Sequence, residues 1–186
     1  MRIIAGMKKG HKIDTLEGNS TRPTLDRVKE SLFGIIQFDI IERNVLDLFA
    51  GSGNLGFEAL SRGASHAVFV DSNAECVKII KNNANKLNLT EKCTDIHADY
   101  KQALSQLCNK SMRFDVVFLD PPYESKLAEE AIQTLIDFNL LSHGAIIVAE
   151  HSNSVEIPLL SGLKLRTTRK FHQTAITLFD YVGEPK

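Results

Sequence analysis

The sequence predicts a one-domain α/β protein with a mostly parallel sheet that helices cover on both faces. Apolar runs of strand length alternate along the chain with segments of helical period, as βαβ units require. The run 114–119 is apolar almost throughout, which is typical of a strand buried on both sides. At 186 residues, with 43% hydrophobic and 24% charged residues, the chain fits a single domain with its own core.

An extension is expected before the sheet. Residues 1–22 are predicted to form an N-terminal β-hairpin around Gly6 and Gly10, and residues 23–38 a leading helix. A proline introduces this helix, and proline suits the first helical turn. The catalytic core is then expected to occupy 44–186.

Within this core, strands and helices are expected to alternate until the last two strands. The first five strands are short, mainly apolar runs at 45–50, 66–70, 94–98, 114–119 and 144–149. Helices with apolar residues at helical spacing are expected at 54–62, after Asn73, and at 125–140. No helical pattern separates 163–168 from 174–182, so these runs are expected to pair as a closing antiparallel hairpin.

The cysteines argue against both a disulfide framework and a thiolate metal site. Cys76, Cys93 and Cys108 are odd in number and widely spaced, and no C-x-x-C occurs. The chain start lacks a signal-peptide pattern, and no apolar run approaches the ~20 residues that span a membrane. We therefore expect a cytoplasmic protein without a metal ion, and a monomer by default.

Charge is distributed unevenly, although the net charge is only −1. Residues 1–30 and residues 160–186 each carry a net charge of +3, which leaves −7 for the residues between them. Basic ends around an acidic body suit a phosphate-facing rim. Ordinary solvated lysines explain the same pattern, so charge alone assigns no partner.

A glycine-rich turn follows the first expected strand, in the sequence Asp47-Leu48-Phe49-Ala50-Gly51-Ser52-Gly53-Asn54-Leu55-Gly56. Gly51 and Gly53 remove side chains where a ligand must approach the backbone, and Gly56 lets the helix pack closely on the strand. The turn satisfies the dinucleotide pattern G-x-G-x-x-G, and Asp71, 20 residues after Gly51, suits a ribose diol. Nicotinamide or flavin binding is therefore one interpretation.

Asp47 favours a different cofactor, S-adenosylmethionine. This carboxylate stands four residues before the first glycine of the turn and is expected to point into the crevice at the strand end. It would repel the anionic pyrophosphate of a dinucleotide there. It would attract the ammonium group of S-adenosylmethionine, either directly or through water.

The fourth expected strand runs directly into Asp120-Pro121-Pro122-Tyr123. The two prolines stiffen the backbone and end sheet pairing at an edge where open parallel sheets bind ligands. An exocyclic base amine is a poor nucleophile, because its lone pair is delocalised into the ring. The Asp120 carboxylate and the Pro121 carbonyl would accept hydrogen bonds from the two N–H groups of the amine. These bonds would direct the nitrogen lone pair at a sulfonium methyl group. Tyr123 offers a ring on which the target base stacks, worth ~1–3 kcal/mol per base.

Further short motifs accompany the turn and the Asp-Pro-Pro-Tyr element. They are Met1-Arg2-Ile3-Ile4-Ala5-Gly6, Arg22-Pro23-Thr24, Asp26-Arg27-Val28, Glu30, Leu32-Phe33 and Glu58-Ala59-Leu60-Ser61-Arg62-Gly63. With them the sequence resembles the RsmD-type 16S ribosomal RNA guanine-N2 methyltransferases over nearly the whole chain, although 171–174 depart from the family pattern. The resemblance implies a Rossmann-like class I S-adenosylmethionine-dependent methyltransferase fold with a seven-stranded sheet. It also implies S-adenosylmethionine as methyl donor, and 16S rRNA, alone or in the small ribosomal subunit or its assembly intermediates, as partner.

The resemblance also implies which residues hold the cofactor. The expected set is Asp47, Phe49, Ala50, Gly51, Ser52, Gly53, Gly56, Asp71, Ser72, Ala98 and Asp99. Within this set, Asp71 would hold the ribose, and Ala98 with Asp99 would border the adenine. Asp99 is equally well placed to cap a helix that begins at Tyr100. The target amine would be held by the catalytic residues Asp120, Pro121, Pro122 and Tyr123.

Basic residues near the start of the chain are the candidate RNA contacts. They are Lys8, Lys9, Lys12, Arg22 and Arg27, together with Lys29. The three lysines before residue 13 fall at the expected hairpin tip, while the others surround the leading helix. Arg27 is also placed to reach the cofactor carboxylate, and a solvated helix face is the alternative to any RNA contact.

The leading hypothesis is methyl transfer from S-adenosylmethionine to the exocyclic N2 amine of a guanine in 16S rRNA. A DNA adenine-N6 methyltransferase uses the same chemistry, but few residues remain outside the core to build its target-recognition segment. An NAD-dependent oxidoreductase would explain the glycine turn and Asp71. It would leave Asp120 and its prolines without a role.

Overall fold

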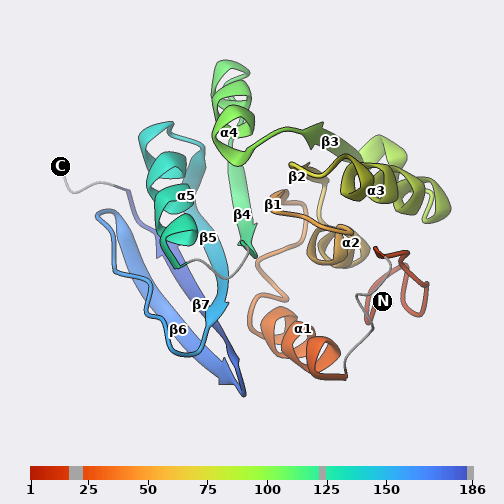
Figure 1. Ribbon diagram of the computed structural model, residues 1–186, viewed down its shortest axis with the longest axis horizontal. Helices are drawn as coiled ribbons and strands as arrows, with labels where there is room; N and C mark the ends of the chain where they lie inside the picture. The colour runs from red at the N-terminus through yellow and green to blue at the C-terminus, as the bar shows by residue number, and fades with distance from the viewer. Residues whose placement is uncertain (17–22, 122–124, 184–186) are drawn as a thin grey trace.

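A computed structural model describes residues 1–16, 23–121 and 125–183. Its centre is a seven-stranded sheet in the order β3-β2-β1-β4-β5-β7-β6 (Figure 1). The strands are β1 Asn44–Leu48, β2 His66–Asp71, β3 Cys93–His97, β4 Phe114–Leu119, β5 Leu141–Ser152, β6 Leu163–Phe171 and β7 Thr174–Tyr181. Only β7 runs antiparallel to its neighbours β5 and β6. The predicted fold class, including the closing antiparallel hairpin, is confirmed.

Helices cover both faces of the sheet (Figure 1). They are α1 Pro23–Ile35, α2 Asn54–Ser61, α3 Ala74–Lys86, the 3-10 turn η1 Thr90–Lys92, α4 Tyr100–Asn109 and α5 Ser125–Asp137. Apolar residues of α1, α2 and α3 pack in one core with one face of the sheet. Those of α4 and α5 form a second core on the other face. None of the described helices is long and apolar enough to cross a membrane.

The bounds of β5 differ most from the prediction, which placed this strand at 144–149. The strand extends from Leu141 to Ser152. At its start, the pairing with β4 shifts register around Gly144, whose φ is 76°, so the expected glycine breaker lies within the strand. At its end, pairing with β7 continues to Ser152, opposite Thr174. Tertiary pairing therefore lengthened a strand whose local sequence suggested a shorter one.

The expected N-terminal hairpin is present as a short antiparallel contact. Arg2 and Lys12 form a single bridge, and Ile3 N–H donates to the His11 carbonyl over 2.9 Å. Residues 17–22 of the predicted extension lie outside the described residues. The described part is therefore a compact turn, and its position depends on contacts with α2.

A buried carboxylate of α2 fixes this N-terminal turn. The Glu58 side chain is fully buried, and it accepts backbone N–H groups from Ile4 at 2.9 Å and Ala5 at 3.0 Å. Arg62 donates to the same carboxylate at 2.8 Å, and the Lys29 ammonium lies 3.2 Å away. Two cations and two amides thus compensate one buried charge, which ties the first residues, α1 and α2 together.

The prediction that Lys29 contacts RNA phosphates is wrong. Its side chain is only 2% exposed, and its Nζ donates to the Arg2 carbonyl at 2.7 Å and to Asn54 Oδ1 at 2.9 Å. Burial and these bonds occupy the ammonium inside the fold. The sequence correctly placed Lys29 on the leading helix, but it did not show that Lys29 lies on the buried side of that helix.

Gly56 packs against β2 as the glycine turn predicted. A Cβ atom at this position would lie 2.3 Å from the Phe69 ring, closer than folded proteins tolerate. We expect Gly56→Val to lower the free energy of unfolding by about 1–3 kcal/mol or more, because the ring has to move within a filled core. Urea denaturation followed by circular dichroism measures the change.

Gly34→Ala is the matched control for this substitution. Gly34 lies in α1 on the exposed surface, and a Cβ there would meet nothing within 4 Å. Alanine in a helix is more stable than glycine, so this variant should equal or exceed the parent in stability. Equal stability of Gly56→Val and the parent would contradict the close packing of α2 on β2.

Candidate functional site

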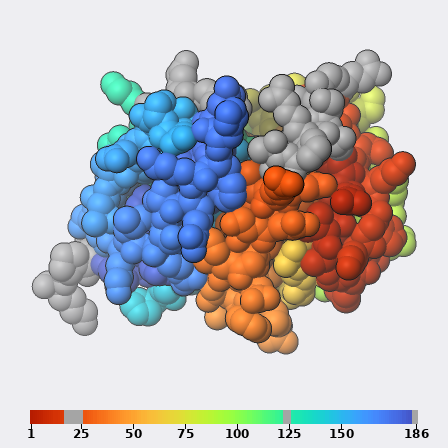
Figure 2. All heavy atoms as spheres, turned by 90° about the horizontal axis from the view of Figure 1, so that it is seen from below, coloured from red at the N-terminus to blue at the C-terminus, as the bar shows by residue number. Residues whose placement is uncertain are grey.

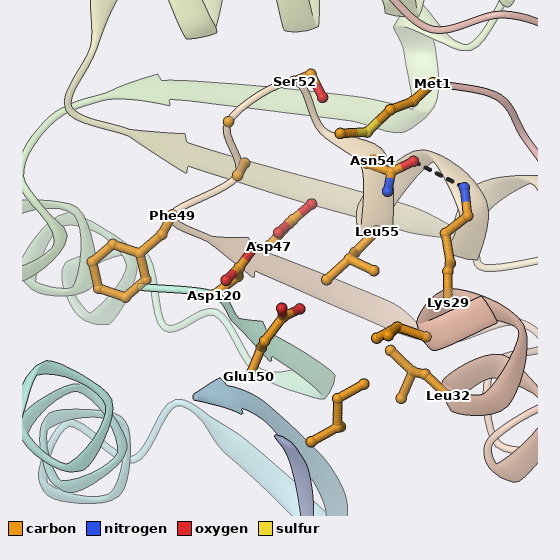
Figure 3. Close-up of a pocket in the computed structure, with 14 residues that line it drawn as sticks. Met1, Lys29, Leu32, Asp47, Phe49, Ser52, Asn54, Leu55, Asp120 and Glu150 are labelled. Atoms are coloured by element: carbon orange, nitrogen blue, oxygen red, sulfur yellow. Dashed lines mark hydrogen bonds between the residues drawn. The ribbon is translucent and has the colours of Figure 1, made fainter. Parts of the chain in front are cut away.

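Three carboxyl groups gather at the carboxyl ends of neighbouring strands β1, β4 and β5 (Figure 3). Asp47 pairs in register with Phe118 of β4. Leu119 at the end of β4 pairs with Ala149 of β5, and Asp120 and Glu150 are the residues that come next on each strand. Side chains at matching positions of parallel strands share a face, so the sheet itself brings the three acids to the side that α1 covers.

A crevice opens between these acids, the glycine turn and α1. Residues 49–52 line one wall, and α1 lines another. The other lining residues besides the acids are Met1, Asn54, Leu55 and Ile176, and those of α1 are Val28, Lys29 and Leu32. Figure 3 shows Asp47, Asp120 and Glu150 turned toward one another within it. The turn that begins at Gly51 and the corner at Asp120 thus face a single space, as a shared site requires.

The turn is built from residues with left-handed backbone conformations. Phe49 has a φ of 70° and Gly53 a φ of 79°, and Gly53 N–H donates to the Ala50 carbonyl at 2.7 Å. A Cβ added to Gly51 would meet nothing within 4 Å, so the backbone borders open space at this point. A ligand can therefore approach the Gly51 backbone closely.

The residues expected around ribose and adenine lie across the turn from this crevice. Asp71, at the end of β2, accepts Gly51 N–H at 2.8 Å through one oxygen and Asn73 N–H at 2.8 Å through the other. Ser72 is exposed, and Ala98 is half-buried at the end of β3. None of these residues lines the crevice of the three acids. The Gly51–Asp71 bond links the two regions directly.

Asp99 acts as a helix cap. Its side chain accepts the N–H of Lys101 at 2.9 Å, which satisfies a free donor in the first turn of α4. The side chain is otherwise exposed. Of the two roles expected for Asp99, the structure exhibits the cap, and the adenine contact stays a prediction.

Asp47 is the most buried of the three acids, with 2% exposure. It accepts Gly56 N–H at 2.9 Å, so it also fixes the start of α2. Burial, increased by the nearby charges of Asp120 and Asp71, raises the pKa of Asp47 to about 8. The bond to Gly56 opposes this shift without cancelling it. Asp47 therefore holds a proton at neutral pH unless a positive charge binds beside it.

Asp120 and Glu150 titrate as neighbours. Desolvation raises the pKa of Asp120 to about 6, although the residue retains contact with solvent through the crevice. Burial and the charge of Asp120 raise the pKa of Glu150 to about 8. At pH 7 the pair therefore holds about one proton, with Asp120 ionised and Glu150 neutral. Such a pair can accept and donate hydrogen bonds side by side.

The remaining expected residues have varied positions. Pro121 follows Asp120 and is half-buried, whereas Pro122, Tyr123 and Arg22 lie outside the described residues. The other RNA candidates are exposed or half-exposed on the first turn and α1: Lys8, Lys9, Lys12 and Arg27.

Glu150 was missed by the sequence reasoning, although a signal was present. It directly follows the apolar run of the fifth strand, as Asp120 follows that of the fourth. The rule that ligands bind beyond the carboxyl ends of parallel strands applies to both positions. The α1 wall and Met1 had no comparable signal, because long-range packing brings them to the crevice.

Comparison with known proteins is consistent across sequence and structure. The family model Conserved hypothetical protein 95 matches residues 1–180. YlbH of Bacillus subtilis is 45% identical over 91% of this chain and 92% of its own. Ribosomal RNA small subunit methyltransferase D of Haemophilus influenzae is 42% identical over 81% of this chain and 78% of its own. The solved structure of yhhF from Escherichia coli covers 99% of both chains at 32% identity, with a TM-score of 0.85.

The raised pKa of Asp47 predicts a pH-dependent stability. Its folded pKa of about 8 lies above the ~3.9 of an unfolded aspartate. The folded state therefore binds more protons between these values, and the free energy of unfolding should fall as pH rises from about 4 to 8. Asp47→Asn removes this contribution, so its urea-denaturation stability should decline less over pH 5 to 8 than that of the parent.

The matched control is Asp137→Asn, at an exposed acid that ends α5. This variant should keep the pH dependence of the parent, because Asp137 is exposed and lies outside the crevice. Parallel stability curves for Asp47→Asn and the parent would show that Asp47 is ionised in the fold at neutral pH.

Proposed function

The chain belongs to the Conserved hypothetical protein 95 family, the RsmD-type family, and on this premise we propose that it methylates the N2 amine of a guanine in 16S ribosomal RNA. The methyl donor is S-adenosylmethionine. One observation carries the proposal: the glycine turn and Asp120 line the same crevice. A methyl donor on the turn and an amine at Asp120 would then meet within it.

The residues around the turn suit the parts of this cofactor. Open space at Gly51 admits a ligand against the backbone, and the buried carboxyl of Asp47 suits a cationic ammonium group. Asp71 retains lone pairs for ribose hydroxyl groups, since each of its oxygens accepts only one backbone N–H. The cofactor supplies an electrophilic methyl group on a sulfonium, and the protein supplies position and charge.

Asp120 handles the amine in this proposal. Its carboxylate and the Pro121 carbonyl accept hydrogen bonds from the two N–H groups of the target amine, which directs the nitrogen lone pair toward the methyl group. When the new N–C bond has formed and the C–S bond has broken, the nitrogen carries an extra proton. The ionised Asp120 is placed to take that proton, and S-adenosylhomocysteine and N2-methylguanine are the products. Its pKa of about 6 keeps it ionised at neutral pH.

Exposed basic residues that suit RNA belong to the N-terminal segment, α1 and β6. On one face of the molecule the N-terminal segment, α1 and the last strands lie side by side (Figure 2). Lys9, Lys12 and Arg27 are exposed on the first two of these, and Arg169 on β6. Arg166 differs, because Asp39 and Asp180 hold its guanidinium in ion pairs. We assign the phosphate contacts to the exposed group.

The two alternatives have less support. A nicotinamide-dependent oxidoreductase would place an anionic pyrophosphate near Asp47 and leave Asp120 and Glu150 without a role. A DNA adenine-N6 methyltransferase needs a separate target-recognition segment, whereas the described residues are almost wholly accounted for by one sheet and its covering helices.

Asp120→Ala tests the assigned chemistry. We expect methyl transfer to 16S rRNA from labelled donor to fall by a factor of about 100 to 1,000 or more, the typical loss for a group that orients and stabilises reacting atoms. Affinity for S-adenosylhomocysteine, measured by calorimetry, should stay within a few-fold. Asp137→Ala is the control and should keep full activity. Normal turnover by Asp120→Ala would overturn the mechanism.

The phosphate contacts predict a salt-dependent effect. The double variant Lys9→Ala/Lys12→Ala should bind 16S rRNA less tightly, and the slope of log affinity against log salt should fall by about 1–2. Filter binding at several salt concentrations measures both quantities. Lys110→Ala, at the end of α4 on the other side of the sheet, is the control and should bind as the parent does. Unchanged affinity and slope in the double variant would exclude the N-terminal turn from the interface.

A further inference from the structure

Glu150 enters the crevice beside Asp120 but has no task in the reaction described above. Its carboxyl takes part in no hydrogen bond or ion pair with residues 1–16, 23–121 or 125–183. In the same part of the chain, every fully buried side-chain nitrogen or oxygen has a partner. Glu150 lines the crevice, and its carboxyl group is turned into it, where a ligand can reach its oxygens (Figure 3).

Strand pairing fixes where this carboxyl lies. The preceding residue, Ala149, pairs with Leu119 of β4, so Glu150 stands level with Asp120 on the adjacent strand. On its other side Glu150 pairs with Ile176 of β7, an apolar member of the crevice wall. If a flat ring rests on that wall with one polar group of its edge at Asp120, the neighbouring polar groups of the same edge lie beside Glu150.

We propose that Glu150 recognises the N1–H and O6 groups of the target guanine while Asp120 holds its N2 amine. This inference rests on the proposed function and adds a residue that selects the base. The observation behind it is that two carboxyl groups stand side by side at adjacent strand ends, one already assigned to the amine. Guanine presents its N2 amine, N1–H and O6 in that order along one edge.

The chemistry of a neutral carboxyl matches this edge. Its carbonyl oxygen accepts N1–H, and its O–H donates to O6. Burial and the Asp120 charge raise the pKa of Glu150 to about 8, which keeps it neutral at pH 7. A metal ion is a poorer explanation, because the described residues contain no group of three His, Cys, Asp or Glu side chains arranged to hold one.

Substitution by glutamine and by alanine separates recognition from structure. A glutamine amide also offers an acceptor oxygen beside an N–H donor, so Glu150→Gln should retain guanine methylation within a few-fold. Glu150→Ala loses both bonds, and its kcat/KM on guanine should fall by about 10- to 100-fold. Calorimetric binding of S-adenosylhomocysteine and the melting temperature of both variants check that the fold and the cofactor site are intact.

A base analogue provides the decisive comparison. Mass spectrometry first locates the methylated guanine, and rRNA fragments are then synthesised with guanine or 2-aminopurine at that position. 2-Aminopurine keeps the exocyclic amine but lacks O6 and the N1 hydrogen. The parent should prefer guanine over 2-aminopurine, Glu150→Gln should keep most of this preference, and Glu150→Ala should lose about 10-fold or more of it. Taking the ratio cancels the intrinsic difference between the two amines.

The outcomes distinguish a failure of the recognition role of Glu150 from a failure of the proposed function. If the parent methylates guanine and Glu150→Ala keeps the full preference over 2-aminopurine, the recognition role is wrong and the proposed function stands. A loss of equal size on both bases, or a Glu150→Gln variant as impaired as Glu150→Ala, also overturns the recognition role. If the parent transfers no methyl group to the N2 amine of guanine, the proposed function itself fails.

Discussion

The partial desolvation of three neighbouring carboxyl groups is the constraint on which the rest of the site depends. The parallel pairing of β1, β4 and β5 makes their proximity unavoidable, since Asp47, Asp120 and Glu150 occupy neighbouring strand ends on one face. All three pKa values are raised, and only Asp120 stays ionised at neutral pH. Folding gives no reason to gather three carboxyl groups at one place, so their presence in an otherwise well-paired core indicates a binding task.

The contacts of Glu58 hold the N-terminal turn and α1 against α2, beside the crevice. The Glu58 carboxyl group is fully buried and is surrounded by Lys29, Arg62 and two backbone amides. Lys29 also lines the crevice, yet its ammonium group contacts the Arg2 carbonyl, Asn54 and Glu58. It therefore forms no ion pair with the three acids of the crevice. The fold therefore keeps a cation nearby without neutralising the carboxyl groups. Positive charge for Asp47 and Asp120 has to come from a ligand.

Local sequence predicted most of the fold and about half of the site. The alternation of apolar runs with helical periods placed every core strand, and the glycine turn and Asp120 identified the crevice. Glu150 and the α1 wall were missed, because which strand ends become neighbours is decided by sheet order rather than by sequence distance. Lys29 was assigned wrongly for the same reason: its partner Glu58 lies 29 residues along the chain, so its burial has no local signal.

The raised pKa values also give the site an order of binding. Under the proposed function, a positive charge on the turn lowers the pKa of both Asp47 and Asp120, and the ionised Asp120 is the form that accepts the amine protons. Glu150 lies farther from the turn, on the next strand, so it keeps its proton more readily than Asp120 does. A cationic methyl donor thus prepares one carboxyl as an acceptor and leaves its neighbour able to donate. S-adenosylhomocysteine has lost the sulfonium charge, so the same carboxyl groups hold the product less strongly than the methyl donor.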